Sequence, residues 1–347
     1  MAKAQSARLA LAKYLALRLV LIIPTVLILV TVVFFFMRVI GDPITAAQGG
    51  RLPPEEIEAR KQAAGYNDPI LVQYGRFLWG ILHGDFGTTT DNQSVSTILV
   101  NYGPATVELV FWALIVAFAV GIPLGRLAAR RYNKAPDIAI RSFAVLFYAA
   151  PVFFVALVLK LIFSIWLGWL PISGRASPTS QVALESGVGV NTHVYIINAI
   201  QSGQWYLVKD VLLHAVLPGL ALGLLTAGVF IRLIRINLLQ TLRADYVTAA
   251  RARGVPERKV VSKHAFRNAL IPVVTVMGME IALMLGGAIL TETTFEWQGL
   301  GYWLSQYLLK RDFVAVQGIT TAIAVIIAVA SFLIDAINAL VDPRVRY

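Results

Sequence analysis

The segment Asp245–Pro272 is densely basic, lies between two long apolar runs and reads DYVTAARARGVPERKVVSKHAFRNALIP. Asp245 is placed to act as a helix N-cap, and Gly254 suits the left-handed position that follows a helix. Pro256 is placed to open a second helix, with Glu257 in its first turn. The spacing therefore predicts two short helices joined by a sharp corner.

The first of these helices has a surface suited to contact with another protein. Its alanines keep it thin enough to enter a groove, and its arginines can pair with acidic side chains around that groove. The alternative is an amphipathic helix held by anionic lipid headgroups, but the helix lacks the large apolar stripe that this requires. We therefore predict a protein-docking site made of Asp245, Tyr246, Ala249, Ala250, Arg251, Arg253 and Gly254.

The chain lacks the motifs on which most enzymes and nucleotide-binding proteins depend. Neither a GxxxxGK[ST] phosphate loop nor an HExxH motif occurs. Cysteine is absent, which excludes disulfides and thiolate metal sites. A membrane hydrolase would need a buried nucleophile beside a base, whereas the four histidines are scattered: His83, His193, His214 and His264. We expect a non-catalytic chain that holds no metal or cofactor of its own.

The composition is that of a membrane protein. Hydrophobic residues make up 58% of the chain and charged residues only 14%, against about 25% charged residues in soluble proteins. The net charge of +11 would suggest nucleic acid in a soluble protein. In a membrane protein, basic residues gather in cytoplasmic loops, so we expect contact with membrane lipid and none with nucleic acid.

Six predominantly apolar stretches have the length of roughly 20 residues that a membrane-spanning helix needs. They are Leu17–Phe36, Thr106–Leu127, Ile140–Leu161, Val211–Ile231, Leu270–Leu290 and Gln317–Ala339. The first resembles a signal peptide, but Leu19–Met37 is uncharged for longer than the roughly 7–15 residues of such a core, and we interpret it as a retained span. Most of the 30 Lys and Arg residues fall on one side, which predicts a cytoplasmic location for that side and for both termini.

A long external segment, Arg38–Pro104, is predicted to form a small ordered extracytoplasmic subdomain. Within it, Glu55–Ala64 has early acids and late bases, as a short helix favours. A loose loop is the alternative. A second external segment, Pro171–Asp210, is expected to be mobile. The predicted parts are a tail with the first span (1–37), the subdomain (38–104) and a transmembrane domain (105–347) containing the docking region (243–267).

Glu280 is the one acidic residue deep within a predicted span. A central charge costs roughly 2.5–3.5 kcal/mol on insertion scales, so this side chain must face protein or water. Two interpretations stay open: Glu280 lines a translocation path, or it is a protonated or hydrogen-bonded structural residue. Small residues recur at four-residue spacing at Gly219 and Gly223 and at Gly278, Ala282 and Gly286, which predicts close helix contacts, and we expect the fifth span to be buried in the bundle.

The docking segment resembles the EAA-type signature of bacterial ABC-importer permeases, in which EAA is followed by a Gly and later by a Pro. Here these positions read Thr248-Ala249-Ala250, Gly254 and Pro272, and the Thr resembles the peptide-importer branch. Further stretches fit that branch in order and spacing: Gly41-Asp42-Pro43, Gly84-Asp85-Phe86-Gly87, Thr106-Val107-Glu108-Leu109, and Glu292–Gly301 with Gln298 replacing a Pro. The chain is similar to B-type permease subunits of dipeptide or oligopeptide ABC importers.

This resemblance implies an all-α integral membrane protein with the type I ABC importer permease fold, six transmembrane helices and a location in the bacterial inner membrane. It implies three kinds of partner: a homologous second permease subunit, cytoplasmic subunits that bind ATP and Mg, and an extracytoplasmic peptide-binding protein. The docking site would couple to the ATPases, and Glu280 would meet a peptide's amino group. The alternatives are a related importer of nickel complexes or glutathione, an ATP-independent channel or carrier, and a membrane scaffold.

Overall fold

The computed structural model describes residues 2–40, 45, 53–63, 65–186 and 192–341. Regular elements in this part of the chain are helical, apart from one isolated bridge between Thr88 and Ser94. The long helices are α1 (Ala2–Ile40), α5 (Val95–Arg130), α10 (Trp205–Leu242), α14 (Ile271–Phe295) and α16 (Phe313–Val341). The shorter elements are α3 (Pro54–Ala63), α4 (Ile70–Leu82), α6 (Ala135–Ala149), α7 (Val152–Leu159), η1 (Lys160–Trp166), α8 (Pro178–Ser186), α9 (Tyr195–Gln201), α11 (Asp245–Ala252), α12 (Glu257–Lys259), η2 (Val260–Ala265), α13 (Phe266–Ala269) and α15 (Leu300–Leu309).

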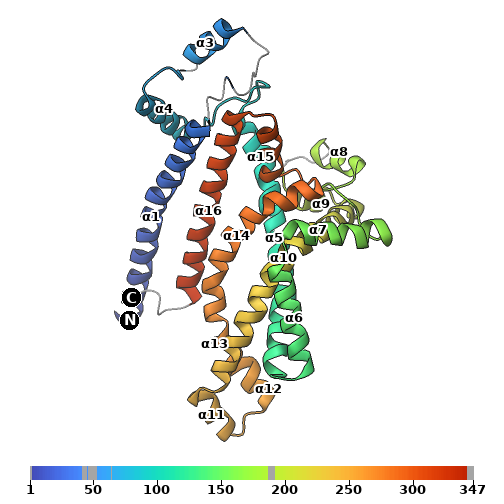
Figure 1. Cartoon of the computed structure of the whole chain (residues 1–347). Coiled ribbons are helices and arrows are strands. Elements are labelled where there is room, and N and C mark those ends of the chain that lie inside the picture. The colour runs from blue at the N-terminus through green and yellow to red at the C-terminus, as the bar shows by residue number, and fades with distance from the viewer. Residues whose placement is uncertain (1, 41–44, 46–52, 64, 187–191, 342–347) are drawn as a thin grey trace.

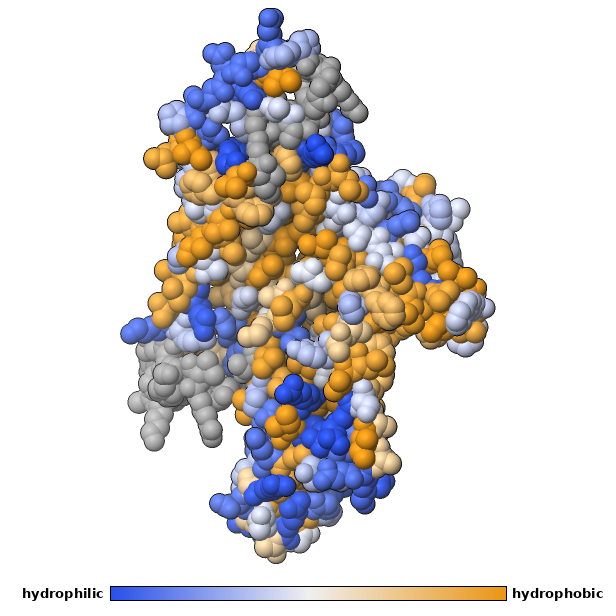
Figure 2. Space-filling model, viewed as in Figure 1, coloured by the Kyte–Doolittle hydropathy of each residue, from blue (hydrophilic) through white to orange (hydrophobic). Residues whose placement is uncertain are grey.

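The all-α membrane fold is confirmed. Five helices are long and apolar enough to cross a membrane, and a sixth span arises if α6 and the α7–η1 helix are counted as one broken span. Figure 2 shows apolar side chains around the middle of the molecule, with hydrophilic residues gathered toward its two ends. Helices suit this position because lipid offers no hydrogen-bond partner to an open backbone.

The third predicted span, Ile140–Leu161, is a broken helix. Its two halves meet at an angle of 109°. Ala150 takes an extended conformation with φ −77° and ψ 135°, which is the conformation that a following proline favours. Pro151 also has no backbone N–H to continue the helix. The chain therefore turns sharply at this point, and α7 runs out sideways from the bundle (Figure 1).

The central helix of the bundle is α10, not the fifth predicted span. Of the most apolar stretch of α10, 72% is buried, against 33% for α14. The main core joins Leu109 and Ala113 of α5 to Leu222 and Phe230 of α10. The expected close contacts are present on α10, where the Gly223 position lies against α5. The small residues of α14 are less enclosed, and Gly286 faces open space.

The two ends of the bundle carry different elements (Figure 1). One end, here called the α4 end, carries α3 and α4; the predicted short helix over Glu55–Ala64 is present there as α3. The opposite end, here called the α11 end, carries α11 and α12 and also the start of α1 and the finish of α16. In the described part of the second external segment, Leu184 of α8 and Tyr195 of α9 pack against the start of α10, while residues 187–191 at the middle of that segment lie outside the described residues.

The contact between α5 and α10 generates a stability prediction. A Cβ added at Gly223 would lie 2.5 Å from the carbonyl oxygen of Ala113 and 2.8 Å from Cβ of Val116. Gly223→Ala should therefore destabilise the protein by about 1–3 kcal/mol, as overpacking typically does. Gly286→Ala is the matched control, because no heavy atom lies within 4 Å of its added Cβ. Thermal unfolding in detergent measures both, and equal midpoints would contradict this packing.

Candidate functional site

The predicted docking helix is α11, which lies at the α11 end of the bundle (Figure 1). Its inner face consists of Val247 and Ala250, which are buried against Leu238 of α10 and Ala129 of α5. Its outer face exposes Thr248, Ala249 and Ala252 beside the ring of Tyr246. Apolar packing on one side therefore anchors a thin helix whose other side is open to contact.

The predicted corner after α11 is confirmed, with one correction. Gly254 has φ +72°, in the left-handed region, directly after the last residues of α11. Pro256 precedes α12, and Glu257 is the first residue of that helix. Asp245, predicted as the N-cap, is instead the first helical residue, and Ala244 occupies the cap position without a side-chain bond. The Asp245 carboxylate still lies at the helix end where the helix dipole favours negative charge.

Arg251 forms hydrogen bonds within the chain although its side chain is 41% exposed, and its predicted role in docking stays a prediction. Its Nε and Nη2 donate to the two carboxylate oxygens of Glu257 at 3.0 and 2.8 Å. Its Nη1 donates to the carbonyl oxygen of Leu242, the last residue of α10, at 3.2 Å. This arrangement, here called the Arg251 clasp, joins α10, α11 and α12 and holds the corner between them.

The other predicted docking residues divide into anchoring and exposed groups. The Tyr246 hydroxyl accepts a hydrogen bond from Nδ2 of Asn268 at 2.9 Å, which links α11 to α13. Ala250 is buried in the contact with α5 and α10. Ala249 and Arg253 are exposed, and within the described residues Arg253 forms no ion pair. Of the two predicted docking arginines, Arg253 is therefore the one without an ion pair among the described residues.

The Arg251 clasp has a defined pH dependence. Hydrogen bonding to Arg251 lowers the pKa of Glu257 below its usual value. The clasp is thus fully formed above the ordinary pKa of a glutamate and is lost as the pH falls through the lowered pKa. Glu257→Gln should loosen the corner and make the Arg251–Pro256 stretch more sensitive to trypsin at neutral pH. The charge swap Arg251→Glu with Glu257→Arg should restore resistance; no recovery would contradict the clasp.

Glu280 lies about midway along α14 and is buried, with 6% of its surface exposed. It borders a hollow of about 530 Å³ between α6, α10 and α14, together with Tyr148 and three basic residues, Arg141, Arg232 and Arg235. Within the described residues its carboxylate makes no hydrogen bond. An acid at the edge of an open, partly basic hollow fits the path-lining interpretation better than a structural hydrogen bond, and the assignment stays a prediction.

The Glu280 hollow is bounded by a tight ion pair. Arg235 of α10 donates from Nε and Nη2 to the two oxygens of Asp137 at 2.6 and 2.8 Å. The same carboxylate accepts the backbone N–H of Asn133 at 2.9 Å. Asp137 is fully buried, so this bidentate pair fixes the start of α6 against α10 and defines one wall of the hollow.

Glu280→Gln tests the role of this residue. The amide has nearly the same size, and the carboxylate lacks a hydrogen-bond partner in the described residues. In the importer that the family resemblance implies, we therefore expect the complex to assemble normally and transport to change only modestly. Quantifying the assembled complex by size-exclusion chromatography and uptake in proteoliposomes separates the two effects. Loss of the assembled complex would show that Glu280 is structural.

A buried polar network at the α4 end was not predicted from the sequence. Arg175 donates to Glu108 at 2.7 Å, with both side chains almost wholly buried. The Arg175 guanidinium also lies 3.7 Å from the ring centroid of Tyr195. Glu292 is fully buried and accepts the backbone N–H of Tyr302. Glu108 and Glu292 both stand in motifs of the family resemblance, which was the available signal, but only the fold brings Arg175 to Glu108.

No group of three or more His, Cys, Asp or Glu side chains in the described residues could hold a metal ion. Two features stand out: an exposed helix at one end and a partly basic hollow bordered by an acid.

Comparison with known sequences decides the family. Residues 121–347 match the family described as binding-protein-dependent transport system inner membrane component, and residues 11–110 match its N-terminal counterpart. This chain belongs to that family. Its relatives include the dipeptide transport system permease protein DppB of Escherichia coli (strain K12), which is 35% identical over 338 residues and covers 96% of this chain and 99% of the relative.

Two further relatives of this binding-protein-dependent permease are similar over nearly their whole length. The dipeptide transport system permease protein DppB of Alkalihalophilus pseudofirmus is 33% identical over 336 residues, covering 96% of this chain and 99% of the relative. The di/tripeptide transport system permease protein DppB of Pseudomonas aeruginosa is 33% identical over 337 residues, with coverage of 96% and 98%. The chain is thus an inner-membrane transport permease with several spans.

Proposed function

We propose that this chain is the transmembrane permease subunit of an ATP-driven importer of dipeptides or oligopeptides. The observation that carries the proposal is the placement of α11: a thin, half-exposed helix at one end of the bundle, strung between the central helix α10 and the helix α14 that bears Glu280. Its relatives, named as dipeptide and di/tripeptide permeases, supply the substrate class. This favours peptides over nickel complexes, glutathione or an ATP-independent channel.

The partners in this proposal follow from surfaces of the chain. Cytoplasmic ATP-binding subunits, which carry ATP and Mg, receive α11 in a groove and pair with Arg253. A homologous second permease covers the open side of the Glu280 hollow and completes the path. An extracytoplasmic binding protein delivers peptide at the α4 end. The chain itself catalyses no step, and ATP is hydrolysed on its partners.

The proposed coupling uses the rigidity of the α11 end. When the ATPases close, their groove displaces α11. The Arg251 clasp and the packing of Val247 on Leu238 carry this displacement into α10. Because Asp137 and Arg235 tie α6 to the same helix, α6 and α10 move together. The two walls of the hollow then shift relative to the second permease. The translocation path thereby opens alternately to the two sides of the membrane.

The orientation in this proposal places the α11 end in the cytoplasm. The start of α1 and the finish of α16 lie at this same end (Figure 1). The predicted basic side includes the α11 region, and an excess of Lys and Arg marks cytoplasmic segments. Both termini are then inside, and α3 and α4 face outward.

Substitutions in α11 test the coupling. Ala249→Arg places a long side chain on the docking face, and Gly254→Pro cannot adopt the φ of +72° at the corner. Both variants should remain assembled in the membrane while peptide uptake falls by roughly tenfold or more, the factor that a docking defect of about 1.4 kcal/mol produces. Proteoliposome assays of uptake and of ATP hydrolysis measure the uncoupling.

Ala12→Arg in the first part of α1 is the matched control, because it is the same exchange at an exposed position outside α11 and away from the α4 end. Its uptake should stay near that of the parent protein. Normal uptake in both Ala249→Arg and Gly254→Pro would remove the coupling assignment. Failure of the chain to co-purify with a nucleotide-binding subunit would favour a self-contained channel or carrier.

A further inference from the structure

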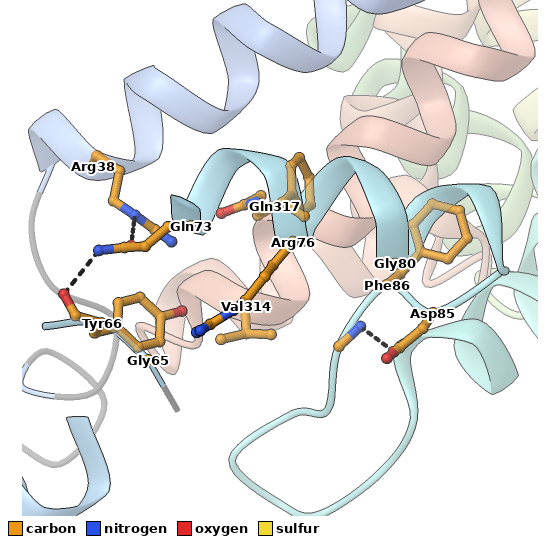
Figure 3. A pocket seen from close by; sticks show the side chains of 12 residues that line it. Arg38, Gly65, Tyr66, Gln73, Arg76, Gly80, Asp85, Phe86, Val314 and Gln317 are labelled. Atoms are coloured by element: carbon orange, nitrogen blue, oxygen red, sulfur yellow. Dashed lines mark hydrogen bonds between the residues drawn. The ribbon is translucent and has the colours of Figure 1, made fainter. Parts of the chain in front are cut away.

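A polar hollow of about 290 Å³ lies at the α4 end, between α1, α4 and the start of α16. Figure 3 shows its lining, with Arg38 on α1, Gln73 and Arg76 on α4, and Gln317 on α16. Asp85 borders it from the loop that follows α4. The hollow is separate from the docking helix and from the Glu280 hollow, and the proposed function assigns it no role.

Arg38 is held in a fixed position within this hollow. Its Nε donates to Oε1 of Gln73 at 3.0 Å, and its guanidinium lies 4.7 Å from the ring centroid of Phe34 and 4.6 Å from that of Tyr66. The amide of Gln73 is committed in turn, donating to the carbonyl oxygens of Tyr66 and Asp68 at 2.8 Å each. The guanidinium is therefore preorganised by its neighbours rather than free to turn toward water.

Arg76 and Gln317 line the same hollow as Arg38 and add two further hydrogen-bond donors. Nη1 of Arg38 is buried and has no hydrogen-bond partner among the described residues. Gln317 is 7% exposed and makes no side-chain hydrogen bond to the described residues. Arg76 adds a second guanidinium, one nitrogen of which pairs with Asp68 at 2.5 Å. A buried charged donor without an acceptor is costly, so this arrangement suits a ligand with several anionic oxygens.

The surroundings of the hollow identify the source of such an anion. Val39, next to Arg38, is 84% exposed, and Phe36 on the last turns of α1 is also exposed. Along α4, Leu71, Trp79 and Leu82 expose their apolar side chains. Apolar side chains with an exposed Trp at the end of a span are typical of the membrane interface. If the anion belongs to a lipid headgroup bound in the hollow, the acyl chains of that lipid would pack against these residues.

We propose that this hollow binds the phosphate of a phospholipid headgroup, with Arg38, Arg76 and Gln317 as the donors. Arginine is suited to this ligand because its planar fork matches phosphate oxygens. Asp85 accepts the backbone N–H of Gly87 at 2.9 Å and places a carboxylate at the rim, beside the hollow. An ethanolamine-type ammonium would pair with it, which favours a zwitterionic headgroup over one with a net negative charge. The bound lipid would join α1 and α4 to α16.

The test uses the assembled transporter, purified and stripped of lipid, with Arg38→Gln and Gln317→Leu as site variants. Lys310→Gln is the control, since Lys310 is an exposed cation near the start of α16 that does not line the hollow. Each sample receives mixed micelles of phosphatidylethanolamine, of phosphatidylglycerol or of diacylglycerol with the same acyl chains, or inorganic phosphate alone. Native mass spectrometry counts retained lipid, and thermal unfolding reports binding.

The parent protein and Lys310→Gln should retain phosphatidylethanolamine and unfold at a higher temperature with it. Arg38→Gln and Gln317→Leu should bind it roughly tenfold more weakly or worse, which corresponds to one lost charge-assisted contact. Gln317→Leu removes no side-chain hydrogen bond within the described residues and so tests the site even if Arg38→Gln misfolds. Phosphatidylglycerol should bind less tightly, and diacylglycerol and inorganic phosphate should not stabilise the parent.

Three outcomes would overturn the proposal. Equal lipid retention in the site variants and in Lys310→Gln would show that lipid binds elsewhere. Equal stabilisation by diacylglycerol would show that the apolar surface, and not the phosphate donors, holds the lipid. Stabilisation by inorganic phosphate as strong as that by phospholipid would make the hollow a site for a soluble anion instead.

Discussion

The close approach of α5 and α10 is the interaction on which the rest of the bundle depends. In lipid, helices gain little from hydrophobic burial against one another, so backbones must come close enough for dispersion contacts. Glycines make this possible along the whole length of the pair: a Cβ at Gly121 would lie 2.8 Å from Cβ of Phe230, and one at Gly125 would lie 2.9 Å from Cβ of Ile234. On α10, Gly223 does the same toward Ala113. The other spans and the docking helix are arranged around this pair.

Ion pairs at both ends of the α5–α10 pair attach the connecting segments to it. Asp137 and Arg235 hold the start of α6 at the α11 end, while Glu108 and Arg175 hold the α8–α9 region at the α4 end. Removing charges from water is costly, and a buried pair is tolerated when further hydrogen bonds complete it. Backbone N–H groups do this for both acids. The segments on either side of the membrane are thus tied to one helix pair, as the proposed coupling requires.

The periphery of the molecule is built differently from its centre. The α1 helix packs on α16 and on α4, where Phe34 contacts the rings of Tyr74 and Phe77, and much of its remaining surface is apolar and exposed. Its contacts with the rest of the chain are polar at both ends: Arg18 pairs with Asp335 at 3.0 Å, and Arg38 bonds to Gln73. A helix held in this way presents a long face to lipid or to another subunit. The α5–α10 pair, in contrast, forms the packed centre of the bundle.

Local physical chemistry explains which parts of the structure could be predicted from the sequence alone. Long apolar runs require helices in a membrane, and a glycine two residues before a proline requires a corner, so the spans and the turn at Gly254 were predictable. Non-local contacts decided the rest. Pro104, Pro123 and Pro218 lie within continuous helices, whereas the chain bends sharply at Pro151; the sequence pattern did not distinguish these prolines, because their outcome depends on packing neighbours. The burial of α10 rather than α14, and the pairing of Arg175 with Glu108, likewise depended on which surfaces folding brought together.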